Sequence, residues 1–205
     1  NMSAKLVHCH PSDNELGKVY APDLSLQASP NAMAIALASI KVADDASRLD
    51  WLRAAKSAYD ASYRVKAQPG DLDMGEVLAH LRDVIPENTI VTNGAGNFAI
   101  WPNKFLKFGP KGRLLAPQSG AMGYGVPAAI AAKLHDPSRF VLCFAGDGDF
   151  QMNGNELGSA MQAGLPLIVL IVNNGTYGTI RMHQERHYPE RVSCTDLVNP
   201  DFVTL

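Results

Sequence analysis

The sequence has no long apolar run, few cysteines and nearly balanced charge. The longest unbroken apolar stretch is Leu165–Val172, far short of the roughly 20 residues that a membrane-spanning helix needs. The 3 cysteines, Cys9, Cys143 and Cys194, are widely spaced, which argues against a disulfide framework and for a reducing compartment. A net charge of −2 gives no sign of a nucleic-acid or anionic-membrane surface. The N-terminus lacks a basic-then-apolar signal pattern, so we expect a cytoplasmic protein.

Strands and helices alternate regularly after the Pro69-Gly70 breaker. The strand candidates are near-continuous apolar runs, which is typical of a sheet covered on both faces. Their alternation with helices predicts an α/β fold, a doubly wound parallel sheet with helices on both faces. The expected strands are 88–93, 112–117, 140–145 and 167–174, and the expected helices are 75–85, 98–107, 125–135 and 155–164.

The segment before the breaker is shorter and less regular. It contains a strand candidate at 5–9 and helix candidates at 30–40 and 44–66, which is little for an independent domain. We therefore expect residues 1–68 to be the tail of a larger unit that continues upstream, and 69–205 to form a second domain. A doubly wound domain normally continues for a further strand, so we expect the fold to be truncated at both ends.

The stretch VLCFAGDGDFQ ends a buried-type strand in two acidic residues. Asp147 follows this strand, and Asn174 follows the next strand along the chain. A right-handed crossover puts both strand ends on one edge of the sheet, where ligands bind. Their side-chain oxygens and the backbone carbonyl of Thr176 are hard ligands suited to Mg²⁺, which typically bridges to a diphosphate. Gly146 and Gly148 let the backbone approach phosphate closely.

The residues after this turn leave alternatives. Asn153 and Glu156 have the spacing of a capping box, which predicts a helix terminus that favours an anion. A calcium loop of the EF-hand type is excluded, because its sixth and twelfth positions are Met152 and Gly158 instead of glycine and glutamate. A plain Asp-Gly turn stays open. For Asp149, a solvated loop position and a ligand position both stay open.

A second glycine loop imitates a nicotinamide-binding fingerprint. Gly94-Ala95-Gly96 follows a strand, and Ala99 completes the pattern. The fingerprint requires an acid about 20 residues further on to bind the ribose. No Asp or Glu lies between Glu87 and Asp136, so a nicotinamide site is disfavoured. We interpret the loop as a second contact at the cofactor edge, with a plain turn as the alternative.

Taken together, these motifs resemble those of a known family. The GDG motif, the spacer 149–172 and the Asn-Asn pair look like the diphosphate motif of thiamine-diphosphate-dependent enzymes. SGAMGYGVPAAIAAK (119–133), VHCHPSDNELGKVYAPDLSL (7–26) and TDLVNPDFVTL (195–205) resemble segments of the acetolactate synthase-like branch. The resemblance covers essentially the whole chain, and it implies that residues 1–68 are the C-terminal part of the central domain plus a linker helix and that 69–205 are the cofactor-binding domain.

The resemblance implies roles for individual residues. It implies thiamine diphosphate as cofactor, bound through Mg²⁺, with Gly120 accepting a hydrogen bond from the aminopyrimidine and Met122 as the apolar wedge that bends the cofactor. The implied metal ligands are Asp147, Asn174 and the carbonyl of Thr176. The implied cofactor-binding residues are Gly96, Asn97, Gly120, Met122, Gly146, Gly148, Asp149 and Asn174.

The same resemblance implies an enzyme, a 2-keto-acid decarboxylase or carboligase that works as a homodimer or homotetramer. In the family, a glutamate from another domain, usually of a second subunit, activates the cofactor. No residue here matches that glutamate, so we expect the isolated chain to be inert or nearly so. Acetolactate synthases proper carry a tryptophan where this chain has His183. His183 and Gln184 are therefore candidate catalytic residues, with a surface role as the alternative.

Two other functions remain alternatives. A non-catalytic, regulatory diphosphate-binding module is compatible with the absent glutamate. A nicotinamide-dependent oxidoreductase is disfavoured by the missing ribose acid.

Overall fold

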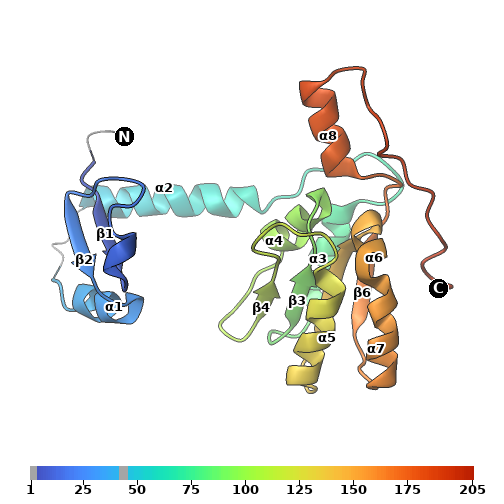
Figure 1. The fold of residues 1–205 in the computed structure, drawn as a ribbon, viewed down its shortest axis with the longest axis horizontal. Helices are drawn as coiled ribbons and strands as arrows, with labels where there is room; N and C mark the ends of the chain where they lie inside the picture. The colour runs from blue at the N-terminus through green and yellow to red at the C-terminus, as the bar shows by residue number, and fades with distance from the viewer. Residues whose placement is uncertain (1–3, 42–45) are drawn as a thin grey trace. The chain divides into compact units, whose positions relative to one another are not determined.

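The computed structural model describes residues 4–41 and 46–205. Its contacts divide the chain into two compact units, one up to Ser57 and one from Ala58 onward (Figure 1). The division falls inside a helix, before the linker that the sequence indicates. The assignment of residues 1–68 and 69–205 to two domains stays a prediction. Within the described residues, no helix combines the length and apolar character that spanning a membrane requires.

The first unit is small and has little core. Strands β1 (Val7–His10) and β2 (Leu24–Gln27) pair in parallel. Helix α1 (Pro30–Ala38) begins at Ser29, whose side chain accepts a hydrogen bond from the backbone N–H of Ala32. Helix α2 (Ala46–Ser62) crosses the division between the units, and neither helix has a buried residue. The sequence predicted β1 and both helices but not β2; residues 44 and 45 of the predicted second helix lie outside the described residues.

The second unit contains a four-stranded sheet and its covering helices. Its parallel strands lie in the order β4-β3-β5-β6. The strands are β3 (Ile90–Asn93), β4 (Arg113–Leu115), β5 (Val141–Gly146) and β6 (Ile168–Val172). The α-helices are α3 (Met74–Val84), α4 (Ile100–Phe105), α5 (Gly125–His135), α6 (Asp147–Asn153), α7 (Leu157–Gln162) and α8 (Gly178–His187).

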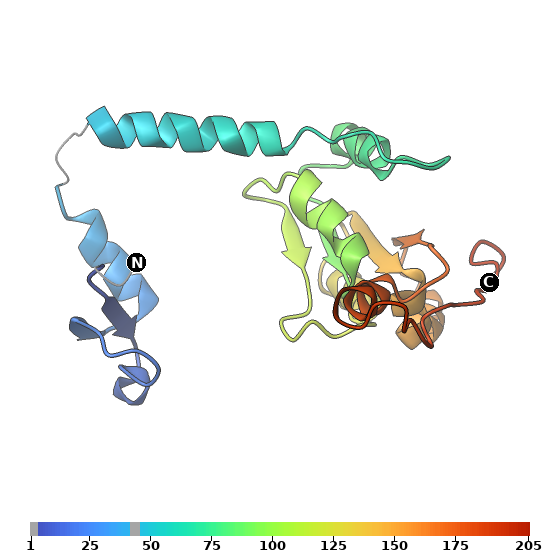
Figure 2. The same cartoon turned by 90° about the horizontal axis from the view of Figure 1, so that it is seen from above.

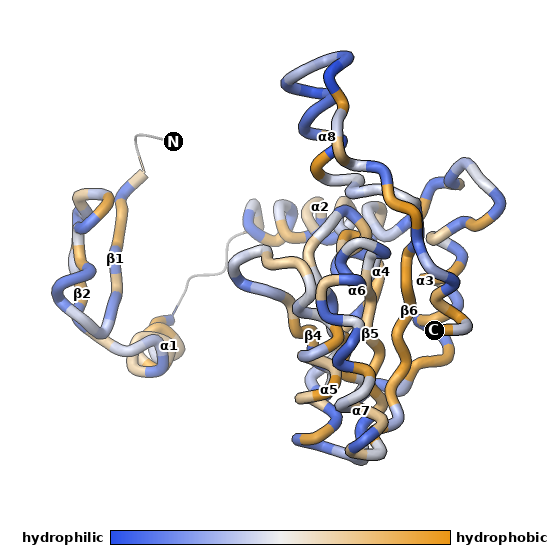
Figure 3. The backbone as a smooth tube through the Cα atoms, turned by 45° about the vertical axis from the view of Figure 1, so that its right-hand side comes forward, coloured by the Kyte–Doolittle hydropathy of each residue, from blue (hydrophilic) through white to orange (hydrophobic). Residues whose placement is uncertain are grey.

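Alternate residues of the strands feed two separate cores, because successive side chains of a strand point to opposite faces. Val91, Leu142 and Phe144 pack with α3 and α4 on one face. Ile90 and Cys143 belong to the core on the other face, together with residues of α5, α6 and α7. Figures 1 and 2 show the helices on both sides of the sheet, and in Figure 3 β6 is hydrophobic along its length whereas α8 is largely hydrophilic. The predicted doubly wound α/β fold is confirmed.

The strand order reverses between β3 and β5. From β3 the chain moves outward to β4, and from β5 it moves outward in the other direction to β6. Such a reversal opens a crevice at the carboxyl ends of the two inner strands, and ligands of doubly wound sheets bind there. The sheet therefore places the loop after Asn93 beside the turn after Gly146.

The structure corrects the predicted helix at 155–164. Helix α6 begins directly at Asp147, a 3-10 turn follows at Gly154–Glu156, and α7 begins only at Leu157. Asn153 caps nothing with its side chain, which donates to the carbonyl of Gly123 at 2.9 Å instead. The predicted capping box of Asn153 and Glu156 is therefore wrong. The helix terminus at the site is that of α6.

Candidate functional site

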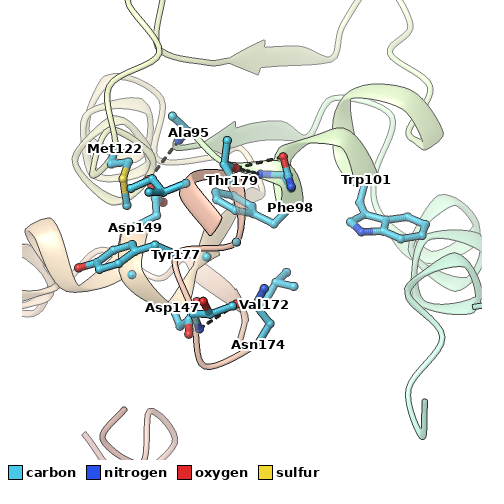
Figure 4. Close-up of a pocket in the computed structure, with 17 residues that line it drawn as sticks. Ala95, Phe98, Trp101, Met122, Asp147, Asp149, Val172, Asn174, Tyr177 and Thr179 are labelled. Atoms are coloured by element: carbon cyan, nitrogen blue, oxygen red, sulfur yellow. Dashed lines mark hydrogen bonds between the residues drawn. The ribbon is translucent and has the colours of Figure 1, made fainter. Parts of the chain in front are cut away.

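A pocket of about 210 Å³ lies at the crevice between β3 and β5 (Figure 4). Its walls come from the two inner strand ends, the segment before α5, and the segment from β6 into α8. Nine residues proposed from the sequence line it: Gly96, Asn97, Met122, Gly146, Asp147, Gly148, Asp149, Asn174 and Thr176. The remaining lining residues are Ala95, Phe98, Trp101, Val172, Tyr177, Gly178, Thr179 and Ile180.

Asp147 is the first residue of α6 and only 2% exposed. Its Oδ2 accepts hydrogen bonds from the backbone N–H of Gly175 at 2.9 Å and from the side-chain amide of Asn199 at 2.7 Å. In the described part of the chain it forms no ion pair with Lys, Arg or His. The two donors stabilise a buried carboxylate, and its charge stays available to a cation.

Asn174 and Thr176 flank Gly175, the residue whose N–H binds Asp147. The pairing of Gly146 with Val172 sets β5 and β6 side by side at this end, which confirms the predicted neighbourhood of the two strand tips. Figure 4 shows Asp147 and Asn174 next to each other in the pocket. One carboxylate and one amide thus lie in one small region. Thr176 also lines the pocket, and its carbonyl accepts a hydrogen bond of 2.9 Å from the N–H of Gly178.

This donor set fits a hard divalent cation. Mg²⁺ prefers a few protein oxygens and completes its shell with water or phosphate. In the described part of the chain, no group of three or more His, Cys, Asp or Glu residues gathers around a common point. The chemistry at Asp147 therefore suits a cation shared with a ligand better than a closed metal cage.

The segment Asn173–Tyr177, here called the metal loop, is held by a distant part of the chain. The segment Thr195–Asn199, here called the strap, lies against it. Backbone bonds of 2.8 Å join Tyr177 N–H to the carbonyl of Thr195, and Leu197 N–H to the carbonyl of Gly175. A Cβ atom on Gly148 would overlap the ring of Tyr177 and lie 3.1 Å from Leu197. The absence of a side chain at Gly148 thus lets the metal loop and the strap close over α6.

Asp149 lies inside the protein and joins two loops of the pocket. It is 4% exposed, and its Oδ1 accepts from the backbone N–H of Gly123 at 2.8 Å and of Ala95 at 3.1 Å. Burial raises the pKa of this carboxyl above its ordinary value, while the bonds from Gly123 and Ala95 act in the opposite direction. The solvated alternative for Asp149 is excluded. A Cβ atom on Gly94 would overlap this carboxylate, so glycine is required there.

The two residues implied for the pyrimidine side differ in position. Met122 is half-buried and lines the pocket. Gly120 is exposed, has a φ of +68° and is not among the lining residues. Between them and α5 lies Gly123, whose N–H and carbonyl are both bound, by Asp149 and Asn153. This fixes the backbone immediately after Met122.

Asn97 connects the first glycine loop to α8. Its backbone N–H donates to Oγ1 of Thr179 at 3.0 Å, and that hydroxyl donates to Oδ1 of Asn97 at 3.0 Å. The dashed lines at Thr179 in Figure 4 mark this pair. The side chain of Asn97 thus contacts α8, and its backbone borders the pocket.

The two candidate catalytic residues lie further along α8, outside the pocket lining. His183 is exposed, and its ring stacks on His187 with centroids 6.0 Å apart. The side-chain amide of Gln184 donates to the carbonyl of Ser193 and accepts from its N–H, both at 3.0 Å. Only the first turn of α8, Gly178–Ile180, borders the pocket.

Sequence reasoning missed the apolar part of the pocket and the strap. Phe98 directly follows the glycine loop and Trp101 lies three residues later, and this closeness to the loop is a signal in the sequence. Val172 directly precedes the Asn-Asn pair and Tyr177 follows it by three residues, so both could have been found in the same way. Asn199 carried no signal, because an asparagine far along the chain shows nothing of its contact with Asp147.

Comparison with known proteins agrees with this geometry. Residues 94–205 match the family described as thiamine pyrophosphate enzyme, C-terminal TPP binding domain. Over 98% of its length, the chain is 35% identical to the acetolactate synthase large subunit of Parasynechococcus marenigrum, covering 33% of that protein. With the same coverage of this chain, it is 33% identical to the large subunit of Corynebacterium glutamicum and 30% identical to the isozyme 2 large subunit of Escherichia coli, covering 34% and 36% of them.

The chain therefore spans about a third of the length of these curated relatives. The family match covers more than half of the chain and includes both strand tips of the pocket. This chain belongs to the thiamine pyrophosphate enzymes, as a C-terminal TPP-binding domain that resembles acetolactate synthase.

Proposed function

We propose that the chain binds thiamine diphosphate through Mg²⁺ as the cofactor-binding part of a 2-keto-acid decarboxylase or carboligase. The observation that carries this proposal is the hydrogen bond of 2.9 Å from the N–H of Gly175 to Asp147. It joins two consecutive strand tips and puts Asn174 and Thr176 beside a carboxylate that forms no ion pair with any described residue. Oxygens from two neighbouring strand ends, beside the switch point, suit a cation that is shared with a diphosphate.

Within this proposal, Asp147, Asn174 and the carbonyl of Thr176 hold the metal. Gly146, Gly148, Asp149, Gly96 and Asn97 form the backbone wall at the diphosphate, with the first turn of α6 among them. Met122 supports the bend of the cofactor from the facing wall. Gly120 offers its carbonyl to the pyrimidine from the exposed rim.

Thiamine diphosphate, when bound, supplies an electron sink for the decarboxylation of a 2-keto acid. The chain's own residues bind and orient it, and apolar side chains such as Phe98, Val172 and Tyr177 limit water in the pocket. No glutamate is among the described residues that line the pocket. We propose that the activating glutamate comes from a pyrimidine-binding domain of the full-length protein or of a second subunit, in a homodimer or homotetramer.

Two further parts of the proposal concern the rest of the chain. Residues 1–68 are proposed as the end of a central domain with a linker helix, and 69–205 as the cofactor domain. His183 is proposed as a catalytic group carried on α8, whose first turn borders the pocket. Gln184, whose amide is bound to Ser193, serves in this proposal to hold α8 to the following segment.

Calorimetric titration of the 205-residue chain with thiamine diphosphate tests the binding proposal. We expect binding with Mg²⁺, no binding after chelation, and at least tenfold weaker binding for Asp147→Asn and Asn174→Ala. Asp71→Asn, an exposed change in the linker, is the matched control and leaves the affinity unchanged. Metal-independent binding, or full affinity in Asp147→Asn, contradicts the metal site, and binding of NAD instead favours the oxidoreductase alternative.

Assays of the isolated chain on a panel of 2-keto acids test the catalytic part of the proposal. We expect no turnover by the isolated chain. We also expect turnover that Asp147→Ala abolishes in a full-length protein carrying the glutamate domain. Robust turnover of pyruvate by the isolated chain contradicts the proposal that the activating glutamate comes from another domain or subunit. Cofactor binding without turnover in the full-length protein favours the regulatory module.

A further inference from the structure

The side chain of Asn199 connects both strand tips of the metal site. Its Nδ2 donates to Oδ2 of Asp147 at 2.7 Å and to Oδ1 of Asn173 at 2.8 Å. Its Oδ1 accepts from the side-chain amide of Gln151, on α6, at 2.8 Å. One amide at the end of the strap thus contacts the residue that follows β5, the residue that follows β6, and the helix between those strands.

The chemistry of these partners fixes the orientation of the Asn199 amide. Both atoms that meet its nitrogen are acceptor oxygens, and the atom that meets its oxygen is a donor nitrogen. A flipped amide would set oxygen against the carboxylate of Asp147 and nitrogen against the amide of Gln151. Such a flip loses all three bonds, so the network permits a single arrangement.

The same network divides the oxygens of the site into two classes. Oδ2 of Asp147 and Oδ1 of Asn173 each accept from both Asn199 and the N–H of Gly175. Those two oxygens are saturated by protein donors. Within the described residues, Oδ1 of Asp147 takes no hydrogen bond, and Oδ1 of Asn174 takes one of 3.3 Å from Thr176. The side-chain oxygens left for a cation are therefore Oδ1 of Asp147 and Oδ1 of Asn174.

We propose that Asn199 is a positioning residue of the metal site. It fixes the carboxylate of Asp147 through one oxygen, so that the other faces the cation, and it holds Asn173 away from the cation so that Asn174 is the amide ligand. This inference rests on the proposed function, because it concerns how the proposed ligands are oriented. The inference adds to the metal site a residue of the strap, which belongs to neither strand tip.

The position of Asn199 on the strap makes this role physically reasonable. Backbone hydrogen bonds of Thr195 and Leu197 align the strap with the metal loop. Because Asn199 ends the strap, these bonds already restrict its position. Groups that hydrogen-bond a metal ligand typically contribute a factor of 10 to 100 to metal affinity. Both polar atoms of the Asn199 side chain form hydrogen bonds with residues at or next to the site. A side chain that only filled space would not need these bonds.

The test is titration of the 205-residue chain with Mn²⁺, followed by electron paramagnetic resonance in the presence of thiamine diphosphate. We expect Asn199→Ala to weaken Mn²⁺ binding about tenfold and to broaden the bound signal, because the carboxylate of Asp147 keeps only the bond from Gly175 and is held less firmly. Gln151→Ala, which releases the far side of the amide, should weaken binding less. The double variant should bind as Asn199→Ala does, since both changes act through one network.

Asn155→Ala is the matched control, because Asn155 is exposed and takes no side-chain bond within the described residues; its Mn²⁺ affinity should equal that of the wild type. Wild-type affinity in Asn199→Ala overturns this inference and leaves the proposed function standing. Absence of bound Mn²⁺ in the wild type overturns both. If Asn199→Ala does not fold, Gln151→Ala decides, and wild-type affinity and signal in that variant overturn the inference.

Discussion

The carboxylate of Asp149 accepts a hydrogen bond from the backbone N–H of Gly123 at 2.8 Å, and the same oxygen accepts from Ala95. A residue of the first turn of α6 thereby fixes the loop after β3 and the loop before α5. These are the loops that carry Gly96 and Met122 to the pocket. The second acid of the Gly-Asp-Gly-Asp turn therefore organises the site from inside, whereas the first faces the proposed cation.

Replacing Asp149 should destabilise the domain. Asp149→Ala leaves two backbone N–H groups without their acceptor in a buried place, which costs about 1–3 kcal/mol for each group. Asp149→Asn retains an acceptor oxygen and should lower the free energy of unfolding less. Chemical denaturation measures both, with Asp71→Ala as the exposed control. Equal stability of Asp149→Ala and the control would remove the role we assign to this carboxylate.

The fold could be predicted because hydrophobic runs, separated by breaker residues, mark most of its strands and helices. The inner strands β3 and β5 are buried along their whole length, and the outer strand β6 is apolar throughout, so their positions follow from the hydrophobic runs in the sequence. Helix α5 was predicted with its observed bounds, 125–135. Helix α6 was missed because GDGDFQMN reads as a turn, and only its packing against the sheet through buried Phe150 makes it helical. Strand β2 was missed because its four residues carry too short a pattern.

The candidate site was predictable only where its residues lie at strand ends. Asp147 and Asn174 could be paired because one crossover joins their strands. The burial of Asp149 depends on two loops far away in the sequence, and no local pattern encodes such a contact. The same holds for Asn199. The capping interpretation of Asn153 failed because its side chain has a tertiary partner, the carbonyl of Gly123, that competes with the local one.

Two glycine-to-alanine changes should have opposite effects. Gly123 has a φ of +81°, and a Cβ atom there would lie 2.7 Å from the side chains of Asn153 and Met152. Gly123→Ala should therefore lower the free energy of unfolding by more than about 1 kcal/mol. Gly158 lies inside α7 with nothing within 4 Å of a Cβ atom, so Gly158→Ala should raise it by about 0.5–1 kcal/mol. Thermal and urea unfolding measure the free energy of unfolding of both variants. A change of the same sign in both would contradict the opposite effects expected here.

The buried thiol of Cys143 should give the stability a defined dependence on pH. Burial raises its pKa from 9.0 to about 11; the neighbouring side chain of Thr92 acts in the opposite direction, and the charge of Asp149 adds a smaller raising effect. A pKa that is higher in the folded state adds stability that is complete below pH 9 and lost as the pH rises through about 11. The loss should approach about 1.4 kcal/mol per pH unit in that window, and Cys143→Ala should lack it.

Thiol labelling measures the same property directly. At pH 8, a disulfide reagent should modify the exposed Cys194 and the half-buried Cys9 in the folded chain and reach Cys143 only in denaturant. Cys143→Ala serves as the control that identifies the protected thiol. Rapid modification of Cys143 in the folded chain would contradict its burial beneath α5.

The role of Met122 can be separated from ordinary packing by a matched pair of methionine variants. Met122 lines the pocket, whereas Met161 on α7 is 84% exposed. If Met122 supports the bound cofactor, Met122→Ala should weaken thiamine diphosphate binding about tenfold, which corresponds to about 1.4 kcal/mol of binding free energy. Met122→Leu should retain most of the affinity, because the side chain keeps its volume and apolar character. Met161→Ala should leave the affinity unchanged.

Calorimetric titration with Mg²⁺ present gives the affinities, and equal values for Met122→Ala and Met161→Ala would show that the side chain of Met122 does not touch the cofactor. The unfolding free energy of Met122→Ala, measured without ligand, separates lost contact with the cofactor from a loosened loop, because only the second lowers the stability of the empty protein.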